Sequence, residues 1–475
     1  MKKNSTLWQI NLRPDADLSL QRQLHHHVRD SILQGELEPG SKLPPSRTLA
    51  RELSVGRITV TEAYDQLIAE GYLEAKQGSG TFVAEHIPDA MVAIAAETDP
   101  TPAAQQPDKA PPLMSGMPAL DEFPADRWAR VAGRVARRLD VLHMYHGDPM
   151  GYLPLRTSIA AYLKSSRNVT CMPSQVMIVS GLQQGLFLLA STIMDGSAPI
   201  ILEDPGYDGL HAAAKASGKP VSFTSVDLLG ATPPSRRGLL VTSPSRQYPL
   251  GYTMPHARRL ELLAWARETD SFILEDDYDS EFRYAGRPLN SLQGIAGGDR
   301  VIYGGTFSKS LFPALRLGYL VLPQGLIDPI CGLRMAIDSF PSICNQQVLH
   351  AFMEDGEFSR HVRRLRKIHS QRKTLFETIA RKQLGDWIDL QPSDAGLHML
   401  GWLTERALAL NLKDDLVADW AQSSNVGAIP VSNCYRQTPS RQGLLMGFAN
   451  LQEKQIEPAI QALASRIRQE TGFSS

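Results

Sequence analysis

The apolar residues of the first 84 positions repeat with the period of a helix and predict three helices. In the first, leucine, valine and isoleucine recur every fourth position over Leu20–Ile32 and share one face. We expect a second helix to start at Ser46 and a third to run from about Arg57 to Glu70, with the turn Ser54–Gly56 between them. The segment Tyr72–Val83 then alternates like two strands around a turn. This part of the chain is therefore predicted to be a small α+β unit.

From residue 113 onward, short apolar runs alternate with helical stretches, which is typical of an α/β domain with a largely parallel sheet. The expected strands are Val176–Val179, Pro199–Glu203, Gly238–Thr242, Phe272–Glu275, Val301–Gly304 and Leu317–Leu322. Polar and glycine-rich residues follow these runs. Because ligand sites in such sheets lie at the carboxyl ends of the strands, these following residues are the place to look for chemistry.

Residues 85–112 lie between these two parts, lack any sustained period and are rich in Ala, Pro, Gln and Asp, which predicts a linker. A chain of 475 residues also exceeds what one hydrophobic core usually organises. We therefore predict a multidomain protein, with a small α+β domain at residues 1–84, a linker at 85–112 and a large α/β domain at 113–475.

The amino-acid composition indicates the cellular compartment and the kinds of partner to expect. Forty-nine basic and fifty acidic side chains nearly cancel, so binding to a polyanion must be argued locally. The four cysteines are too scattered for a zinc site or a disulfide framework, which favours a reducing cytosol. No apolar signal segment and no apolar run of about eighteen residues occurs, so we expect a cytoplasmic protein with no membrane partner. His25, His26 and His27 point in three directions on a helix, which predicts a solvated face and no metal site.

Positive charge gathers around the second and third predicted helices. From Lys42 to Thr61 there are four basic side chains and one acidic one, Glu52. An arginine at a helix start can donate two hydrogen bonds to a guanine edge, and hydroxyl groups can bond phosphate or base, as entry into the major groove requires. Residues 1–84 as a whole hold ten basic and ten acidic side chains. On spacing alone, a helical protein-interaction module with a solvated charged face is therefore the alternative.

One lysine of the large domain, Lys309, lies in a loop just beyond the strand that begins at Val301. A lysine in such a place can form an imine with an aldehyde if burial or nearby cations keep it deprotonated. Thr306, Ser308 and Arg316 supply two hydroxyl groups and a cation, a suitable set for a phosphate. Taken alone, this segment also fits a surface lysine in a serine-rich loop.

A second segment, Phe272–Asp279, is an apolar strand that ends in carboxylates. Pyridoxal 5'-phosphate (PLP) needs an anion beside its pyridine nitrogen and a donor to its ring oxygen, and Asp276 and Tyr278 fit these two roles. Without the lysine segment, the acidic cluster would equally predict a metal site or a solvated loop. Two further segments support PLP: Val179–Gly185, a strand-to-helix turn whose free N–H groups suit a phosphate, and Glu203–Tyr207, which supplies a stacking ring.

The N-terminal part resembles the GntR-type winged helix-turn-helix domain over nearly its full length. The matching segments are Leu33–Arg47, Val60–Tyr64 and Gly71–Leu73. The resemblance implies double-stranded operator DNA as a partner and a wing that reaches the minor groove. The DNA contacts that it implies are Arg47, Arg57, Thr59 and Thr61, with Gln77 and Gly78 in the wing.

The four segments of the large domain come in the order seen in fold-type I PLP-dependent aminotransferases, a resemblance that covers roughly residues 113–450. With the winged helix in front, the whole chain resembles the MocR/GabR-type regulators. This implies PLP as cofactor, Lys309 as the catalytic residue that carries the internal aldimine, Asp276 at the pyridinium and Tyr278 at the ring oxygen. It also implies that Tyr207 stacks on the ring. The phosphate contacts that it implies are Arg316, Thr306, Ser308 and the backbone of Leu182 and Gln183.

Two departures from the aminotransferase pattern bear on activity. Tyr248–Gly251 replaces the usual Asn-Pro-Thr-Gly turn, whose asparagine bonds the ring oxygen. Leu445 stands where those enzymes carry the arginine that clamps the substrate carboxylate, and neither Arg436 nor Arg441 is at the matching place.

The resemblance implies a homodimeric, PLP-dependent regulator that senses PLP, an amine or an amino acid through aldimine chemistry. A ligand can switch such a protein only through different affinities for two shapes. An active aminotransferase with an accessory DNA-binding domain is the alternative, with possible residual transaminase activity in either case. A scaffold that has lost PLP fits least, because Lys309, Asp276 and Arg316 are all present.

Overall fold

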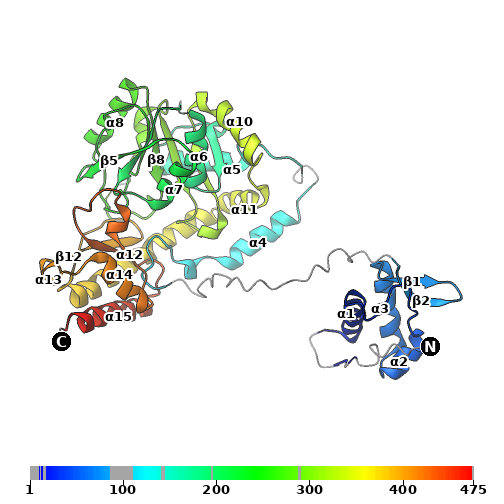
Figure 1. The fold of residues 1–475 in the computed structure, drawn as a ribbon. Coiled ribbons are helices and arrows are strands. Elements are labelled where there is room, and N and C mark those ends of the chain that lie inside the picture. The colour runs from blue at the N-terminus through cyan, green and yellow to red at the C-terminus, as the bar shows by residue number, and fades with distance from the viewer. Residues whose placement is uncertain are drawn as a thin grey trace. The chain divides into compact units, whose positions relative to one another are not determined.

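The computed structural model describes residues 10, 12–13, 18–85, 111–140, 145–193, 196–286 and 290–472. The chain divides into two compact units, Met1–Pro107 and Asp108–Ser475, which are considered separately below (Figure 1). The predicted linker at 85–112 lies outside the described residues apart from Glu85, Pro111 and Pro112.

The N-terminal unit holds three helices and a hairpin: α1 (Leu20–Leu33), α2 (Ser46–Glu52), α3 (Arg57–Ala69), β1 (Leu73–Lys76) and β2 (Gly80–Val83). The residues spaced by four on α1 form its inner face, with Leu24 and Val28 fully buried against α3. The hairpin is antiparallel, from Leu73 opposite Val83 to Lys76 opposite Gly80. The prediction of a small α+β winged helix agrees with this arrangement.

The large unit is built on an eight-stranded sheet with the order β3-β10-β9-β8-β7-β4-β5-β6. Its strands are β3 (Val176–Val179), β4 (Ile200–Asp204), β5 (Val221–Asp227), β6 (Gly230–Ala231), β7 (Leu239–Thr242), β8 (Phe272–Asp277), β9 (Val301–Thr306) and β10 (Gly318–Val321). All are parallel to one another except β10, which is antiparallel to both of its neighbours, and the short β6. The carboxyl ends of β4, β7, β8 and β9 consequently meet along one edge of the sheet.

Helices cover both faces of this sheet because its central strands are apolar on both sides (Figure 1). On β7, Leu239 and Val241 pack under α6, α7 and α10, whereas Leu240 packs on the opposite face with α8 and α9. The covering helices are α4 (Ala125–Ala136), α5 (Leu153–Arg167), α6 (Leu182–Ile193), α7 (Asp208–Ala216), α8 (His256–Glu268), α9 (Leu292–Ala296), α10 (Ile327–Ile337) and α11 (Ile343–Glu354).

The C-terminal part of this unit is a smaller α+β layer with its own core. An antiparallel sheet of order β11-β12-β14-β13 packs against α12, α14 and α15. The elements are α12 (Glu357–Leu384), β11 (Ile388–Leu390), β12 (His398–Leu403), α13 (Glu405–Ala409), α14 (Asp414–Ser423), β13 (Ala428–Pro430), β14 (Gly443–Gly447) and α15 (Glu453–Thr471). In the part of the chain that the structure describes, no helix is long and apolar enough to cross a membrane.

Candidate functional site

A cavity of about 230 Å³ opens at the carboxyl edge of the large sheet and collects the predicted cofactor residues. Its lining includes Leu182, Gln183, Tyr207, Asp276, Tyr278, Thr306, Ser308, Lys309 and Arg316, which are all nine residues expected from the sequence. We call this cavity the cofactor pocket. Segments more than a hundred residues apart in the chain therefore meet at one place.

Strand β8 carries three consecutive carboxylates, Glu275, Asp276 and Asp277. Because side chains alternate along a strand, they point to opposite faces of the sheet in turn. Asp276 points into the cofactor pocket, while Glu275 and Asp277 lie on the other face. Glu275 accepts hydrogen bonds from the backbone N–H groups of Leu292 (2.9 Å) and Gln293 (3.1 Å), and Asp277 forms a buried ion pair with Arg167 (2.7 Å). Only Asp276 is thus available to a ligand.

Burial shifts the pKa values of two groups in the pocket, the Asp276 carboxyl and the Lys309 ammonium. Burial raises the pKa of the Asp276 carboxyl to about 8, helped by the neighbouring carboxylates Asp277, Glu203 and Asp279. Burial lowers the pKa of the Lys309 ammonium, although Asp279 and Asp276 oppose that shift. A lysine with a lowered pKa is more readily uncharged, as a nucleophilic amine must be. A protonated ring nitrogen is the partner that would hold Asp276 ionised.

The loop after β9 places the lysine and its hydroxyl neighbours. Lys309 Nζ donates to the carbonyl oxygen of Gly116 at 2.7 Å, and Thr306 Oγ1 accepts from the backbone N–H of Ser308 at 3.1 Å. Gly116 comes from the segment that precedes α4, more than 190 positions away, and no feature of the sequence pointed to it.

Donors for a phosphate surround the start of α6. Helix α6 begins at Leu182, and the first N–H groups of a helix have no partner within it. Gly181 precedes it with φ of +145°, a conformation that favours glycine, and a Cβ added there would lie 3.6 Å from a guanidinium nitrogen of Arg316. The backbone turn and the guanidinium thus face one another, and the positive φ of Gly181 is what favours glycine at this turn.

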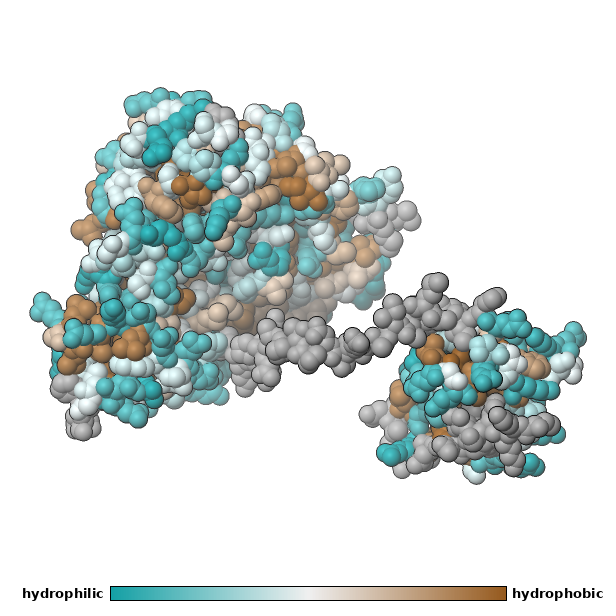
Figure 2. Space-filling model, in the orientation of Figure 1, coloured by the Kyte–Doolittle hydropathy of each residue, from teal (hydrophilic) through white to brown (hydrophobic). Residues whose placement is uncertain are grey.

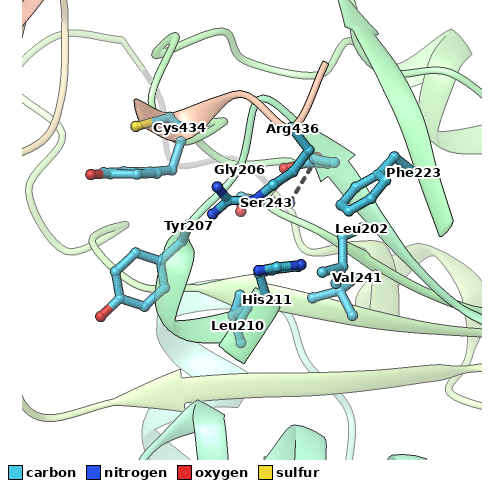
Figure 3. A pocket seen from close by; sticks show the side chains of 12 residues that line it. Leu202, Gly206, Tyr207, Leu210, His211, Phe223, Val241, Ser243, Cys434 and Arg436 are labelled. Atoms are coloured by element: carbon cyan, nitrogen blue, oxygen red, sulfur yellow. Dashed lines mark hydrogen bonds between the residues drawn. The ribbon is translucent and has the colours of Figure 1, made fainter. Parts of the chain in front are cut away.

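Aromatic rings form one wall of the cofactor pocket. The ring of Tyr248 lies 5.7 Å from that of Tyr207, 6.3 Å from that of Tyr278 and 5.7 Å from that of His398, each nearly perpendicular. Tyr248, which opens the turn that replaces Asn-Pro-Thr-Gly in the sequence, therefore lies in this wall. Figure 3 shows a smaller pocket of about 20 Å³, enough for about one water. Its lining shares Tyr207, Leu210 and Tyr248 with the cofactor pocket.

Arg246 is a site residue that the sequence analysis missed. Its guanidinium is buried and donates to Tyr278 Oη (3.3 Å) and to the carbonyl oxygen of His398 (3.0 Å), and it pairs with Asp279 (3.3 Å). Gly396 packs directly on it at φ of +89°, and a Cβ added there would lie 2.4 Å from the guanidinium carbon. Arg246 thus fixes Tyr278 from behind. No local pattern in the sequence marked it.

On β14, Leu445 stands where aminotransferases carry the arginine that binds the substrate carboxylate, and neither Arg436 nor Arg441 takes the place of that arginine. Leu445 is fully buried and packs with Leu400 and Trp402. Arg436 forms an ion pair with Asp208 beside the small pocket, and the Arg441 guanidinium stacks 4.3 Å from the Trp402 ring. Neither lines the cofactor pocket.

Four of the six predicted DNA contacts are exposed in the N-terminal unit. Arg47 and Arg57 are exposed at the starts of α2 and α3, and Gln77 and Gly78 are exposed at the hairpin tip. The other two are less free: Thr59 is half-buried, and the half-buried Thr61 donates its hydroxyl proton to the carbonyl oxygen of Arg57 at 3.0 Å.

The three histidines of α1 need one correction. His25 is not on a solvated face, because it is buried and its Nε2 lies 2.6 Å from a carboxylate oxygen of Glu70 at the end of α3. Within the described ranges, no group of three His, Cys, Asp or Glu side chains could hold a metal ion.

Comparison with known proteins identifies relatives of both units. Residues 20–83 match the family described as bacterial regulatory proteins, gntR family. Along the whole chain, the probable rhizopine catabolism regulatory protein MocR of Rhizobium meliloti is 38% identical over 471 residues, covering 95% of this chain and 94% of the relative. The HTH-type pyridoxine biosynthesis transcriptional regulator PdxR of Corynebacterium glutamicum is 32% identical over 465 residues, covering 96% and 98%.

Among solved structures, the multiple substrate aminotransferase of Thermococcus profundus matches with a TM-score of 0.68 and 24% identity, covering 82% of this chain and 98% of that one. A kynurenine aminotransferase of Pyrococcus horikoshii matches with a TM-score of 0.68 and 22% identity, covering 76% and 92%. At these identities the likeness establishes the aminotransferase fold of the large unit.

A GntR-type winged helix joined to an aminotransferase-fold domain defines a DNA-binding transcriptional regulator with an enzyme-derived effector domain. The chain belongs to the MocR family of GntR-type regulators. The sequence-based prediction of family and fold class is confirmed.

Proposed function

We propose that the cofactor pocket binds PLP through Lys309 and that this ligand, alone or with an amine or amino acid, sets the affinity of the regulator for its operator. The observation that carries the proposal is the single cavity in which Lys309, Asp276 and Arg316 all stand in the lining. A PLP molecule needs an amine, an anion and a phosphate cradle, and these three residues supply one each.

The chain's own residues have distinct tasks in this proposal. Lys309 Nζ, whose pKa burial lowers, would bond the aldehyde carbon; Asp276 would face the protonated ring nitrogen; and Tyr278, which accepts a hydrogen bond from Arg246, would contact the ring oxygen. When bound, PLP supplies an electrophilic carbon that exchanges one amine for another. Amines in solution can thereby compete with Lys309, which gives the pocket a way to sense them.

The fit of a phosphate rests on the donors around Gly181. We assign the Arg316 guanidinium, the hydroxyl groups of Thr306 and Ser308 and the N–H groups of Leu182 and Gln183 to it, and we assign the Tyr207 ring to stacking. Leu445 in place of a clamp arginine favours PLP itself or an amine without a clamped carboxylate as effector, and favours regulation over efficient transamination.

The DNA reader completes the proposal. We assign Arg47 and Arg57 to base or phosphate contacts, Thr59 and Thr61 to hydroxyl contacts near them, and the hairpin tip at Gln77 and Gly78 to the minor groove. The domain limits proposed are 1–84, 85–112 and 113–475, and the regulator acts as a homodimer on double-stranded DNA.

The test of PLP binding is the visible absorbance of the purified full chain after addition of PLP and removal of excess. Wild-type protein and Lys215→Ala, which removes an exposed lysine of α7, should retain a visible band. Lys309→Ala should lose it while keeping its circular dichroism spectrum. A band of equal strength in Lys309→Ala would contradict the assignment of the amine.

A further inference from the structure

A second cavity of about 310 Å³ lies behind the cofactor pocket and is lined almost entirely by polar side chains. It is bounded by the end of α5, the loops that follow β7 and β8, and one residue of α12; the lining that bears on its chemistry is Arg167, Arg246, Arg283, Arg366, Asp279 and Glu281. Of the residues that line the cofactor pocket, this cavity shares only Asp279. We call it the arginine cavity.

Positive charge exceeds negative charge in this lining. Four arginines stand against Asp279 and Glu281. Two of the arginines are neutralised: Arg246 pairs with Asp279 (3.3 Å), and Arg167 pairs with Asp277 (2.7 Å), which lies just outside the cavity. Glu281 accepts a hydrogen bond from Tyr162 Oη (3.1 Å), and burial raises the pKa of its carboxyl to about 7.

The other two arginines have no carboxylate partner. Among the described residues, neither Arg283 nor Arg366 lies within 4.0 Å of a carboxylate oxygen. Arg366 donates its Nε–H to the carbonyl oxygen of Glu281 (2.8 Å), and its terminal nitrogens have no acceptor among the residues that the structure describes. Arg283 Nε is buried without any hydrogen-bond partner, as is Arg246 Nε in the same lining. A buried guanidinium N–H without an acceptor is costly, so such groups are normally met by an anion or ordered water.

We propose that the arginine cavity is a second ligand site, which binds a small carboxylate or phosphate anion between Arg283 and Arg366. Guanidinium groups recognise both kinds of anion through paired N–H donors. The volume suits a molecule the size of phosphate or a four-carbon dicarboxylate. The site is separate from the cofactor pocket, yet Arg246 lines the one and donates to Tyr278 of the other, so a bound anion lies one side chain away from the cofactor.

The test is calorimetric titration of the full chain with succinate and, separately, with inorganic phosphate, at an ionic strength held constant with sodium chloride. All proteins carry Arg316→Gln, which disables the phosphate cradle of the cofactor pocket whether or not PLP binds there. We expect one anion per chain, with affinity reduced about tenfold or more by Arg283→Gln and by Arg366→Gln, since each removes a charge-assisted contact.

The matched control is Arg363→Gln, which removes the same charge from an exposed position of α12 outside the cavity and should change the affinity less than about twofold. Binding of succinate alone or of phosphate alone would support the site and decide the class of ligand. Absence of binding for both anions, or an equal loss in Arg363→Gln, would overturn it. Anion binding by the Arg316→Gln protein, combined with a wild-type protein that shows no visible PLP band, would leave this site standing and refute the PLP proposal.

Discussion

At the scale of single residues, the cofactor pocket depends on small differences between neighbours. Glu275, Asp276 and Asp277 are consecutive acids, yet the pleat of β8 gives two of them internal partners and turns the third toward the pocket. The three acids therefore have different roles, and substituting them one at a time should have different effects.

Replacing Asp276 with Asn should weaken PLP binding by about tenfold to a hundredfold, because a charge-assisted contact to the ring nitrogen is worth about 1.5–3 kcal/mol. The thermal midpoint of the protein without PLP should hardly fall. Glu275→Gln should instead lower the thermal midpoint and leave PLP binding nearly unchanged, because Glu275 accepts hydrogen bonds from two backbone N–H groups in the core. Fluorescence titration with PLP and thermal unfolding measure the two effects, and matching behaviour of both variants would refute the distinction.

The buried histidine His369 predicts a pH dependence of stability. Burial, with Arg372 nearby, lowers its pKa to about 3, against a usual value of about 6.5. As the pH falls below about 6.5 the unfolded chain takes up this proton and the folded chain does not, so folding loses stability on the acid side. From about pH 7 to about pH 5 the loss from this group is about 2 kcal/mol.

Urea unfolding of wild type and His369→Gln at these two pH values tests this. The variant is less stable at neutral pH, because His369 accepts a hydrogen bond from the N–H of Ala119, but the gap between the two proteins should shrink by about 2 kcal/mol at the lower pH. A gap that does not change with pH would show that His369 is not held neutral.

At the scale of elements, we propose that α3 and the hairpin read DNA in the small unit. The exposed start of α3 carries Arg57, and Ile58 beside it is 73% exposed, so this end is not buried within its own unit. A helix that enters the major groove needs such a free N-terminal end.

Arg57→Ala should weaken binding to a DNA duplex selected by the protein from a random library by about tenfold or more, and should lower the salt slope by about one if the contact is to a phosphate. Arg22→Ala removes an equal charge from an exposed position of α1 and serves as the control. Fluorescence anisotropy at several salt concentrations provides the readout. Equal losses in both variants would mean that net charge, and not the start of α3, drives binding.

Elements differ in how well the sequence revealed them. The strands β3, β7, β8 and β9 are continuous apolar runs, and the nine residues predicted from the sequence to bind the cofactor all line one cavity. β5 was missed because only Thr224 in it is buried, so its pattern does not stand out. Arg246, His398 and Gly116 were missed for another reason: each reaches the site only through tertiary packing of distant segments, which leaves no local signal.

At the scale of the whole molecule, some apolar side chains of the large unit are exposed on its surface. Met335 and Ile337 on α10 are 55% and 51% exposed, and Figure 2 shows hydrophobic surface gathered over this helix. Exposed apolar patches on soluble proteins mark interaction surfaces. We propose that this surface contacts a second copy of the chain in the homodimer.

The double substitution Met335→Asp and Ile337→Asp should therefore shift the protein from dimer toward monomer in sedimentation velocity, raising the dissociation constant about tenfold or more. Leu228→Asp changes a residue that is equally apolar and 74% exposed on the β5–β6 turn, and should leave the dimer intact. A monomeric wild type, or a variant that dimerises as well as the control, would refute this interface.

Control of DNA binding by PLP requires coupling between the two units, and one measurement tests this coupling. The affinity of wild type and of Lys309→Ala for the selected DNA duplex would be determined by fluorescence anisotropy, at one salt concentration, with and without saturating PLP. We predict that PLP changes the wild-type affinity about fivefold or more and leaves that of Lys309→Ala unchanged. An equal response of both proteins, or none in the wild type, would contradict the proposal that PLP bound at Lys309 controls DNA binding.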